Sequence, residues 1–286
     1  MKDLKSLIDL LSLEKLDTCL FRGQNFMTPW KRVFGGQVLG QALSAAYQTV
    51  PGERIAHSLH GYFILGGNVD LPIIYSVDVL RDGGSFTTRR VSASQNGKVI
   101  FIMAASFQKM QSGVDHQNVM PDSLDPDTLL TDMQQAEAIK DTMPDVYHKI
   151  KNRVQYAYEF RPENLLDFNS SNAGHVIRNV WMKVTEDIDM TLPMQHQLLA
   201  YASDYDLLLT AVYPHSHELD LRKLFIASLD HAMWFHRDFD IRDWLLYSID
   251  SPSASNSRGM GYGRIFTRDG MLVSTVMQEG LIRQLN

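Results

Sequence analysis

The sequence has little of what several common protein classes require. Its 286 residues include one cysteine, Cys19, which excludes an internal disulfide framework and any zinc site built from a cysteine cluster. No uninterrupted apolar run approaches the roughly 18–20 residues needed to span a bilayer. Basic residues number 27 against 33 acidic ones, and the net charge of −6 disfavours a nucleic-acid or anionic-membrane surface. With 44% hydrophobic residues, we expect a globular protein that binds neither nucleic acid nor membrane.

Several familiar catalytic motifs are also absent. Without a Gly-x-Ser-x-Gly elbow an α/β-hydrolase is disfavoured, and no phosphate-binding P-loop occurs. The glycines at 259, 261 and 263 have the wrong spacing for a dinucleotide-binding fingerprint, and we interpret them as the flexible start of a strand. The pairs His57-x-x-His60 and His231-x4-His236 lack the acidic partners of a zinc-peptidase motif. These observations indicate neither a metal nor an organic cofactor.

The first residues predict an amphipathic helix rather than a secretory signal. Apolar residues recur at helical spacing from Leu4 to Leu11, whereas acids at 3, 9 and 14 interrupt the uncharged core that a signal requires. The final residues do not form a peroxisomal address. We therefore expect a cytoplasmic location.

Self-comparison indicates that the chain contains two similar halves. Three short matches recur in the same order at offsets of 170, 172 and 170 residues, which is typical of an internal duplication. They pair Ser58–His60 with Ser228–Asp230, Ile74–Asp78 with Leu246–Asp250, and Gln108 with Gln278. We predict an N-terminal repeat at 1–110, a partly helical linker at 111–144 and a C-terminal repeat at 145–286. Within the linker, Asp125-Pro126 predicts the start of a helix that continues to Lys140.

Each half shows an apolar helix followed by strands that hairpin turns connect. The helices are expected over Gly36–Thr49 and Met194–Leu209, and Asn96-Gly97 and Asp269-Gly270 are typical hairpin turns. Strands that follow one another without intervening helices favour an antiparallel sheet and an α+β fold. The strands are expected over 77–80, 87–93 and 99–107 in the first half, and over 156–160, 181–184, 244–249, 263–267 and 271–277 in the second.

One acid stands out on the second helix. Asp204 is surrounded by apolar positions on a segment that is apolar nearly all round, which predicts burial inside the sheet. A buried carboxylate is costly unless it is hydrogen-bonded or functional, although a solvent-facing acid at a helix end is the alternative interpretation. Because the first helix contains no acid, we predict one catalytic site in the second half, with the first half serving as scaffold.

The chain resembles the acyl-CoA thioesterase II family, whose members are double hotdogs in which antiparallel sheets wrap central helices. The resemblance covers essentially the whole sequence, and the Asp-His-x-Met-Trp-Phe-His segment is its most specific part. The motifs that carry it are at residues 34–42, 57–63, 201–204, 230–236, 253–259 and 278–280.

The resemblance implies a catalytic trio of Asp204, Ser228 and Gln278. Asp204 would act as base toward a water molecule that Ser228 and Gln278 hold in line with a thioester carbonyl, without metal or cofactor. Ser228 stands where the family pattern has threonine, which keeps the hydroxyl and removes a methyl worth about 0.8 kcal/mol if buried. At the offset of 170, Ser58 and Gln108 match two of the three residues, so the first half would lack only the acid.

The substrate implied is acyl-CoA, and a dimer or tetramer is expected by resemblance alone. Arg89-Arg90, Arg258 and Arg264 are candidates for contacts with coenzyme A phosphates, although solvated strand ends explain them equally well. Two alternatives stay open: another hotdog enzyme such as a hydratase or dehydratase, and a non-catalytic acyl-CoA-binding protein.

Overall fold

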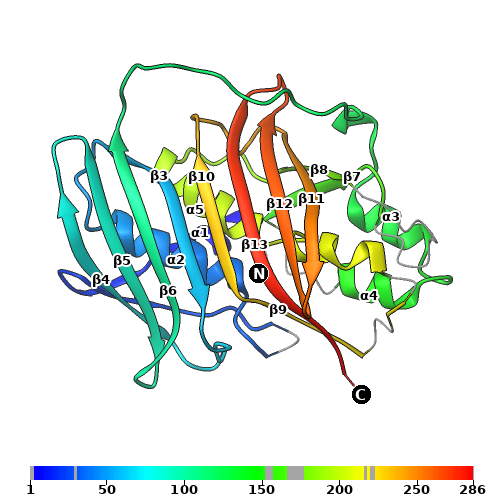
Figure 1. The fold of residues 1–286 in the computed structure, drawn as a ribbon, viewed down its shortest axis with the longest axis horizontal. Helices are drawn as coiled ribbons and strands as arrows, with labels where there is room; N and C mark the ends of the chain where they lie inside the picture. The colour runs from blue at the N-terminus through cyan, green and yellow to red at the C-terminus, as the bar shows by residue number, and fades with distance from the viewer. Residues whose placement is uncertain are drawn as a thin grey trace.

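A single antiparallel sheet of 13 strands runs through the part of the chain that the computed structural model describes, which is residues 3–28, 31–151, 157–165, 177–215, 218–219 and 223–285. The strand order is β1-β2-β4-β5-β6-β3-β10-β13-β12-β11-β8-β7, with β9 also paired to β13. The two halves of the chain meet where β3 pairs with β10, so each half contributes one side of the sheet (Figure 1). The expected antiparallel α+β architecture is confirmed.

In each half two strands precede the central helix and the remaining strands follow it. The first half comprises α1 (Leu4–Leu11), β1 (Glu14–Asp17), β2 (Leu20–Gly23), α2 (Gly35–Tyr47), β3 (Arg54–Phe63), β4 (Ile73–Asp82), β5 (Phe86–Gln95) and β6 (Lys98–Lys109). Between the halves lie the short 3-10 helix η1 (Pro126–Thr128), α3 (Asp132–Ala138) and α4 (Pro144–Lys151). The second half comprises β7 (Tyr158–Pro162), β8 (Arg178–Val184), α5 (Leu192–Ser203), η2 (Leu208–Ala211), η3 (Tyr213–His215), β9 (Leu224–Ser228), β10 (Asp230–Phe235), β11 (Leu245–Ser255), β12 (Arg258–Thr267) and β13 (Leu272–Gln284).

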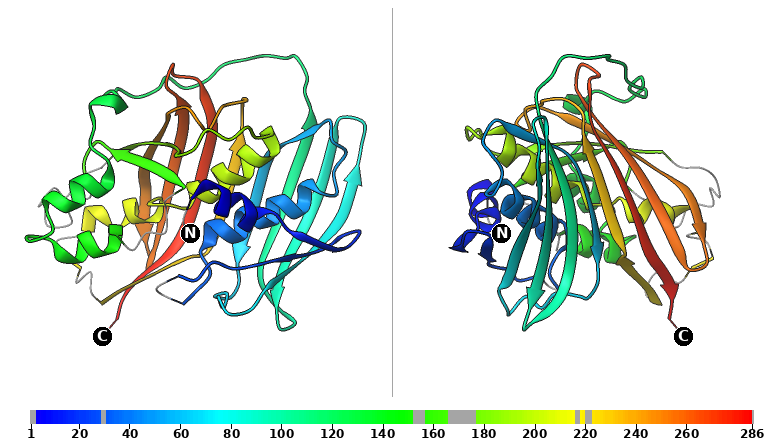
Figure 2. Two further views of the ribbon diagram at one scale, coloured as in Figure 1. Left: turned by 180° about the vertical axis from the view of Figure 1, so that it is seen from behind. Right: turned by 60° about the vertical axis from the view of Figure 1, so that its left-hand side comes forward.

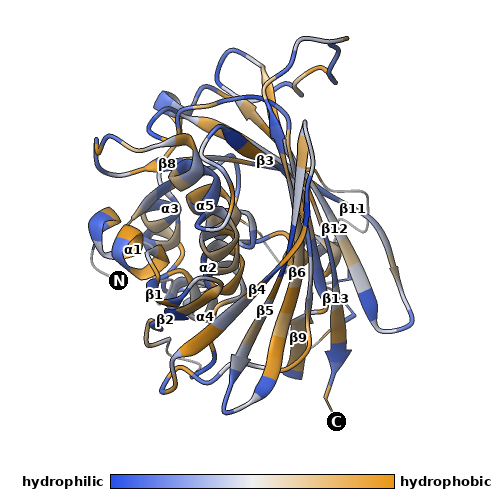
Figure 3. Cartoon of the chain, turned by 90° about the vertical axis from the view of Figure 1, so that its left-hand side faces the viewer, coloured by the Kyte–Doolittle hydropathy of each residue, from blue (hydrophilic) through white to orange (hydrophobic). Residues whose placement is uncertain are grey.

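Helices α2 and α5 pack side by side on the concave face of the sheet, with α1 outside them (Figures 2 and 3). Every residue from Gly36 to Ala46 in α2 is buried, because the helix is covered by the sheet, by α5 and by α1. Gly40 allows this close packing, since a Cβ there would lie 2.8 Å from Leu11 Cδ2 and 3.1 Å from the Gln197 carbonyl oxygen. No helix within the described ranges is long and apolar enough to cross a membrane.

Three local expectations need correction. Helix α5 ends at Ser203 instead of Leu209: Asp204 is its C-cap, Asp206 has a φ of +61°, and Leu208–Ala211 form a separate 3-10 turn. The helix expected from about 125 to 140 is divided into η1 and α3, because Thr131 starts a new helix with a capping box to Gln134. The strand expected from Tyr156 begins at Tyr158, and Tyr156 lies outside the described residues.

The hairpin turns are where the sequence predicts them. Asn96 and Gly97 have φ of +49° and +74°, and Gly270 has a φ of +90°, conformations that asparagine and glycine adopt most readily.

The strand registers align the two halves differently from the sequence matches. Ile74 pairs with Ser94 and Leu246 pairs with Phe266, which gives an offset of 172 for both strands. On that basis Arg89 corresponds to Gly261; their partners on the next strand are Ala105 and Gln278. The counterpart of Gln278 is therefore Ala105, not Gln108.

The counterpart of the serine also changes, by two residues. Ala56 pairs with Phe107 in the first half, and Ser228 pairs with Gly280 in the second. The irregularity in β3 between Ala56 and Ser58 corresponds to the break at Leu229 between β9 and β10. Ser228 thus corresponds to Ala56 instead of Ser58. The expectation that the first half keeps two of the three site residues is wrong, since both equivalent positions are alanine.

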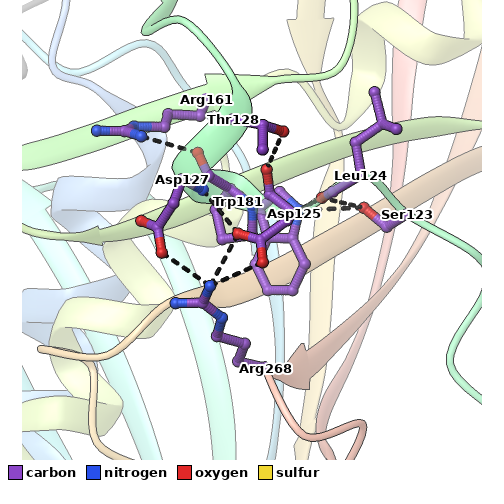
Figure 4. Close-up of polar contacts among 9 residues, drawn as sticks. Ser123, Leu124, Asp125, Asp127, Thr128, Arg161, Trp181 and Arg268 are labelled. Carbon is purple, nitrogen blue, oxygen red and sulfur yellow. Dashed lines mark hydrogen bonds and ion pairs between the residues drawn. The ribbon is translucent and has the colours of Figure 1, made fainter.

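The segment between the halves crosses to the second half, where hydrogen bonds and ion pairs hold it in place (Figures 1 and 4). Arg268 bonds Asp125 and Asp127, each at 2.8 Å. The indole N–H of Trp181 donates to the Leu124 carbonyl oxygen at 2.8 Å, and Arg161 donates to that of Pro126 at 2.8 Å. These contacts hold the segment over a small apolar cluster that contains Trp181, Trp244, Leu246, Phe266 and Leu272.

Candidate functional site

A cavity of about 850 Å³ opens where the two halves meet. Its lining is largely apolar and comes from both halves: residues 32–35, 38, 63–67, 100 and 101 from the first, and 204–206, 208, 209, 225–229 and 278 from the second. Asp204, Ser228 and Gln278 all lie on this wall, so the structure brings the three predicted site residues together in one cavity.

Asp204 lies at the C-terminal end of α5, opposite the N-terminal end of α2. Its side chain is 6% exposed, and the backbone N–H of Gly36 donates to its Oδ2 at 2.8 Å. Two glycines make this approach possible. A Cβ on Gly35 would lie 2.7 Å from Asp204 Oδ2, and one on Gly36 would lie 2.3 Å from the Tyr201 carbonyl oxygen. The first half thus supplies a positive helix end to the carboxylate.

Gln278 connects the other two residues. It lies on β13, and its Nε2 donates both to Asp204 Oδ1 at 2.8 Å and to Ser228 Oγ at 2.9 Å. Both amide hydrogens are therefore used within the trio. Ser228, at the end of β9, accepts one of them and keeps its own hydrogen and a lone pair available on the cavity side.

Burial makes the Asp204 carboxyl group a weaker acid than an ordinary aspartate. Desolvation raises its pKa from 3.8 to about 6, although the hydrogen bonds from Gln278 and Gly36 act in the opposite direction. A carboxylate with a pKa near neutrality in a cavity is a candidate general base, because it is basic enough to take a proton and still ionised at pH 7.

The sequence interpretation missed one residue beside the trio. His231 on β10 is fully buried, with Nδ1 3.9 Å from Asp204 Oδ1 and Nε2 3.0 Å from Ser203 Oγ. The sequence suggested only a weak metal role for it, since it is distant from Asp204 along the chain. The available signal was its place in the Asp-His segment. Side chains alternate between the two faces of a strand, and His231 occupies an inward-facing position of β10.

The arginines considered for coenzyme A phosphates do not line the cavity. Arg89 is buried and bonded to Thr49, Arg90 pairs with Asp78, and Arg258 pairs with Glu279. Among the described lining residues the one cation is Arg32, whose guanidinium lies 5.8 Å from the centre of the Phe225 ring.

Comparison with known proteins gives consistent results over the whole chain. Residues 148–281 match the family described as acyl-CoA thioesterase, and residues 26–108 match the acyl-CoA thioesterase N-terminal domain. The chain is 38% identical over 280 residues to acyl-CoA thioesterase 2 of Haemophilus influenzae, with 98% of each sequence covered.

Solved structures show the same fold. Acyl-CoA thioesterase II TesB2 from Mycobacterium marinum is 38% identical, with a TM-score of 0.80 over 98% of this chain and 99% of that one. A hotdog-fold protein from Alicyclobacillus acidocaldarius, 18% identical, has a TM-score of 0.74 over 98% of this chain and 99% of that one. The expected double hotdog is confirmed.

Proposed function

This chain belongs to the acyl-CoA thioesterase family, and on that premise we propose that it hydrolyses acyl-CoA to a free acid and coenzyme A with Asp204, Ser228 and Gln278 as its catalytic residues. The observation that carries the assignment is the buried Asp204 carboxylate on the wall of the cavity, joined to Ser228 through Gln278.

The hydrogen bonds define where a reacting water would bind. Gly36 and Gln278 each occupy one lone pair of the two Asp204 oxygens, so the carboxylate can still accept a hydrogen from water. A water that donates one hydrogen to Asp204 and the other to Ser228 Oγ keeps a lone pair free for attack. Gln278 acts in this scheme by holding both partners, which fixes the direction of that lone pair.

The reaction follows from this arrangement. The water oxygen attacks the thioester carbonyl carbon while Asp204 accepts its proton, and the carbonyl oxygen becomes an oxyanion. When the tetrahedral intermediate collapses, the carbon–sulfur bond breaks and the thiolate of coenzyme A takes the proton from Asp204. The carboxylate is regenerated, and no metal or cofactor takes part in any step.

The two halves have different parts in this proposal. We assign the catalytic side chains to the C-terminal repeat at 145–286 and treat 1–110 as scaffold and 111–144 as linker. The first half supports the site with the Gly36 N–H and one cavity wall. Arg32 is the cation of the lining that suits a phosphate of coenzyme A, and the apolar lining suits an acyl chain.

A hydratase or dehydratase fits the site less well. Such chemistry in a hotdog pairs the acid with a histidine that reaches the substrate. His231 is fully buried, its Nε2 is engaged by Ser203, and none of the described cavity-lining residues is a histidine. These contacts favour hydrolysis over the alternative.

Assembly into a dimer or tetramer is a further proposal. Tyr62 and Ile102 are paired neighbours on β3 and β6 and remain 57% and 37% exposed, which supports burial against a second copy. Light scattering coupled to size-exclusion chromatography measures the state directly; a monomer at micromolar concentration would contradict the proposal. A cytoplasmic location stays a prediction.

Thiol release from acyl-CoA tests the assignment of the base. Asp204→Asn keeps the size of the side chain and removes its basicity, so kcat/KM should fall by about 10²–10⁴-fold. Asp189→Asn is the matched control because that carboxylate is fully exposed and outside the cavity. Near wild-type hydrolysis by Asp204→Asn would remove Asp204 as the base.

A further inference from the structure

The buried His231 imidazole is bonded at one nitrogen and unpartnered at the other. Its Nε2 lies 3.0 Å from the Oγ of Ser203, which is the last residue of α5. Its Nδ1 is buried, has no hydrogen-bond partner, and lies 3.9 Å from Asp204 Oδ1. A buried polar atom without a partner is unusual in a folded protein, and this one faces the carboxylate of the site.

The hydrogen bonds of Ser203 determine which nitrogen of His231 carries the hydrogen. The Ser203 hydroxyl donates its one hydrogen to the Ala200 carbonyl oxygen at 2.9 Å. With that hydrogen on Ala200, the hydroxyl accepts from His231, which makes Nε2 the protonated nitrogen and leaves a lone pair on Nδ1. Burial also lowers the pKa of His231 to about 3, so the ring is neutral where the carboxylate titrates.

We propose that Ser203 and His231 form a positioning pair that keeps a lone pair, not an N–H, directed at Asp204, and so keeps this carboxylate a stronger base. The inference rests on the proposed role of Asp204. The opposite tautomer would turn an N–H toward Asp204 at 3.9 Å, and the positive end of that dipole favours the ionised carboxylate and weakens it as a base. Neither residue touches the substrate, because both are fully buried behind Asp204 and neither lines the cavity.

The other groups that face Asp204 provide a constant background. The carboxylate accepts hydrogen bonds from the Gly36 N–H and from Gln278. Tyr201 and Tyr247 stay neutral because burial raises the pKa of each hydroxyl. The neighbouring acid, Asp206, is paired with Arg178 at 2.9 Å. None of them changes when Ser203 or His231 is substituted.

Nitrogen-15 NMR of the histidine rings tests the tautomer directly. In the wild-type protein, the His231 signals should show a protonated Nε2 and an unprotonated Nδ1 at pH 7. In Ser203→Ala, Nε2 loses its acceptor, and we expect the population to shift to the Nδ1–H tautomer. A wild-type spectrum with hydrogen on Nδ1, or on both nitrogens, would overturn the proposal.

The pH profile of kcat/KM tests the consequence. In Ser203→Ala, the acid limb should shift to lower pH by about one unit, and the plateau should fall roughly three- to tenfold because the base is weaker. His231→Asn places an amide that can donate near the Nδ1 position and should shift the limb in the same direction. Ser44→Ala, a buried serine on the other central helix, should leave the limb in place.

The results separate this inference from the proposed function. If Asp204→Asn remains active, the assignment of the base fails whatever the tautomer. If Asp204→Asn is inactive while Ser203→Ala and His231→Asn fold and keep the wild-type acid limb, only the positioning role is overturned.

Discussion

At equivalent positions on the concave face of the sheet, the first half carries large side chains where the second half carries glycine. Arg89 and Phe107 are fully buried in the first half, and their counterparts by strand register are Gly261 and Gly280. The glycines at 259, 261 and 263 lie in the N-terminal part of β12, where each is paired with β13, so their predicted place at the start of a strand is confirmed.

The space left by these glycines is filled by a different part of the chain. A Cβ on Gly261 would lie 2.6 Å from the Leu207 carbonyl oxygen, and one on Gly280 would lie 2.1 Å from Leu208 Cδ2. In the first half six residues, 48–53, connect the helix to the next strand; in the second half 20 residues, 204–223, make the same connection. The longer connection begins at Asp204 and supplies part of the cavity wall.

The ends of the two central helices show the same contrast in charge. At the C-terminal end of α2, Arg89 donates to the Thr49 carbonyl oxygen at 2.9 Å, a favourable place for a cation. At the C-terminal end of α5 stands Asp204, where the helix dipole opposes a negative charge. The first half thus has a favourable charge at this helix end, whereas the second half has an unfavourable one, on the residue that we propose as the base.

The largest difference between the halves should appear when the two glutamines are compared. Gln278→Ala removes the group that joins Asp204 to Ser228, so kcat/KM should fall on the order of 10²-fold through misplacement of the water. Gln108→Ala should have little effect, because by register Gln108 is not the counterpart. Steady-state thiol release measures both, and equal losses would favour the alignment at offset 170.

A substitution on β12 should affect the site through the connection at 204–223, which packs against this strand. Gly261→Ala would press on the backbone of Leu207, and we expect roughly a tenfold loss of kcat/KM with a destabilisation of about 1–3 kcal/mol. Arg89→Ala at the equivalent position should lower stability but leave the activity of the folded fraction intact. Denaturant unfolding and kinetics on the same samples separate the two effects; full activity in Gly261→Ala would show that the segment can move freely.

The stability of the protein should depend on pH through Asp204. Because its folded pKa of about 6 exceeds the ordinary 3.8, the folded protein binds this proton more tightly than the unfolded chain does. The protonated Asp204 therefore stabilises the fold below about pH 4, and this stabilisation is lost as the pH rises toward 6. Over the same pH range kcat/KM should rise, because the carboxylate that acts as base is being formed. Asp204→Asn should therefore be more stable than wild type at pH 7.5, by about 1–3 kcal/mol.

Thermal unfolding at pH 4 and pH 7.5 measures this difference, with Asp189→Asn as the exposed control. An Asp204→Asn protein that is less stable than wild type at both pH values would mean that the hydrogen bonds to the carboxylate outweigh the cost of its burial.

The smallest effect is expected at the hydroxyl. Ser228→Thr restores the residue of the family pattern and keeps the donor and acceptor, so kcat/KM should change by no more than about threefold. Ala56→Ser at the equivalent position of the first half should not change it at all. A tenfold change in Ser228→Thr would show that the extra methyl blocks the water or the substrate.

The architecture could be predicted because its signals are local. Turns such as Asn96-Gly97 and the apolar character of the two helices are sufficient to indicate antiparallel strands around central helices. The burial of Asp204 was predicted from the same apolar pattern, even though α5 ends at Ser203, one residue before Asp204. Leu207–Leu209 continue the apolar run, and only the backbone at Asp206 shows that they belong to another segment.

The register could not be predicted for a physical reason. The offset between the halves changes from strand to strand: it is 172 from Arg89 to Gly261 but 173 from Ala105 to Gln278. A change of one residue moves a side chain to the opposite face of a strand, so no single offset aligns both strands. Only the pairing of Gln278 with Gly261, and of Ala105 with Arg89, reveals the counterparts. The contact of His231 with Asp204 likewise depends on how α5 lies against β10, which no local pattern reveals.

The pairing of β3 with β10 in one chain has a consequence for how such a protein can evolve. In a symmetric dimer, every substitution appears at both copies of an interface, so a costly carboxylate would be introduced twice. Covalent fusion removes that constraint: Gly261 and Asp204 each occur once, and Arg89 and Phe107 persist in the other copy. One half can therefore accumulate changes that weaken it, while the other continues to hold the shared sheet together.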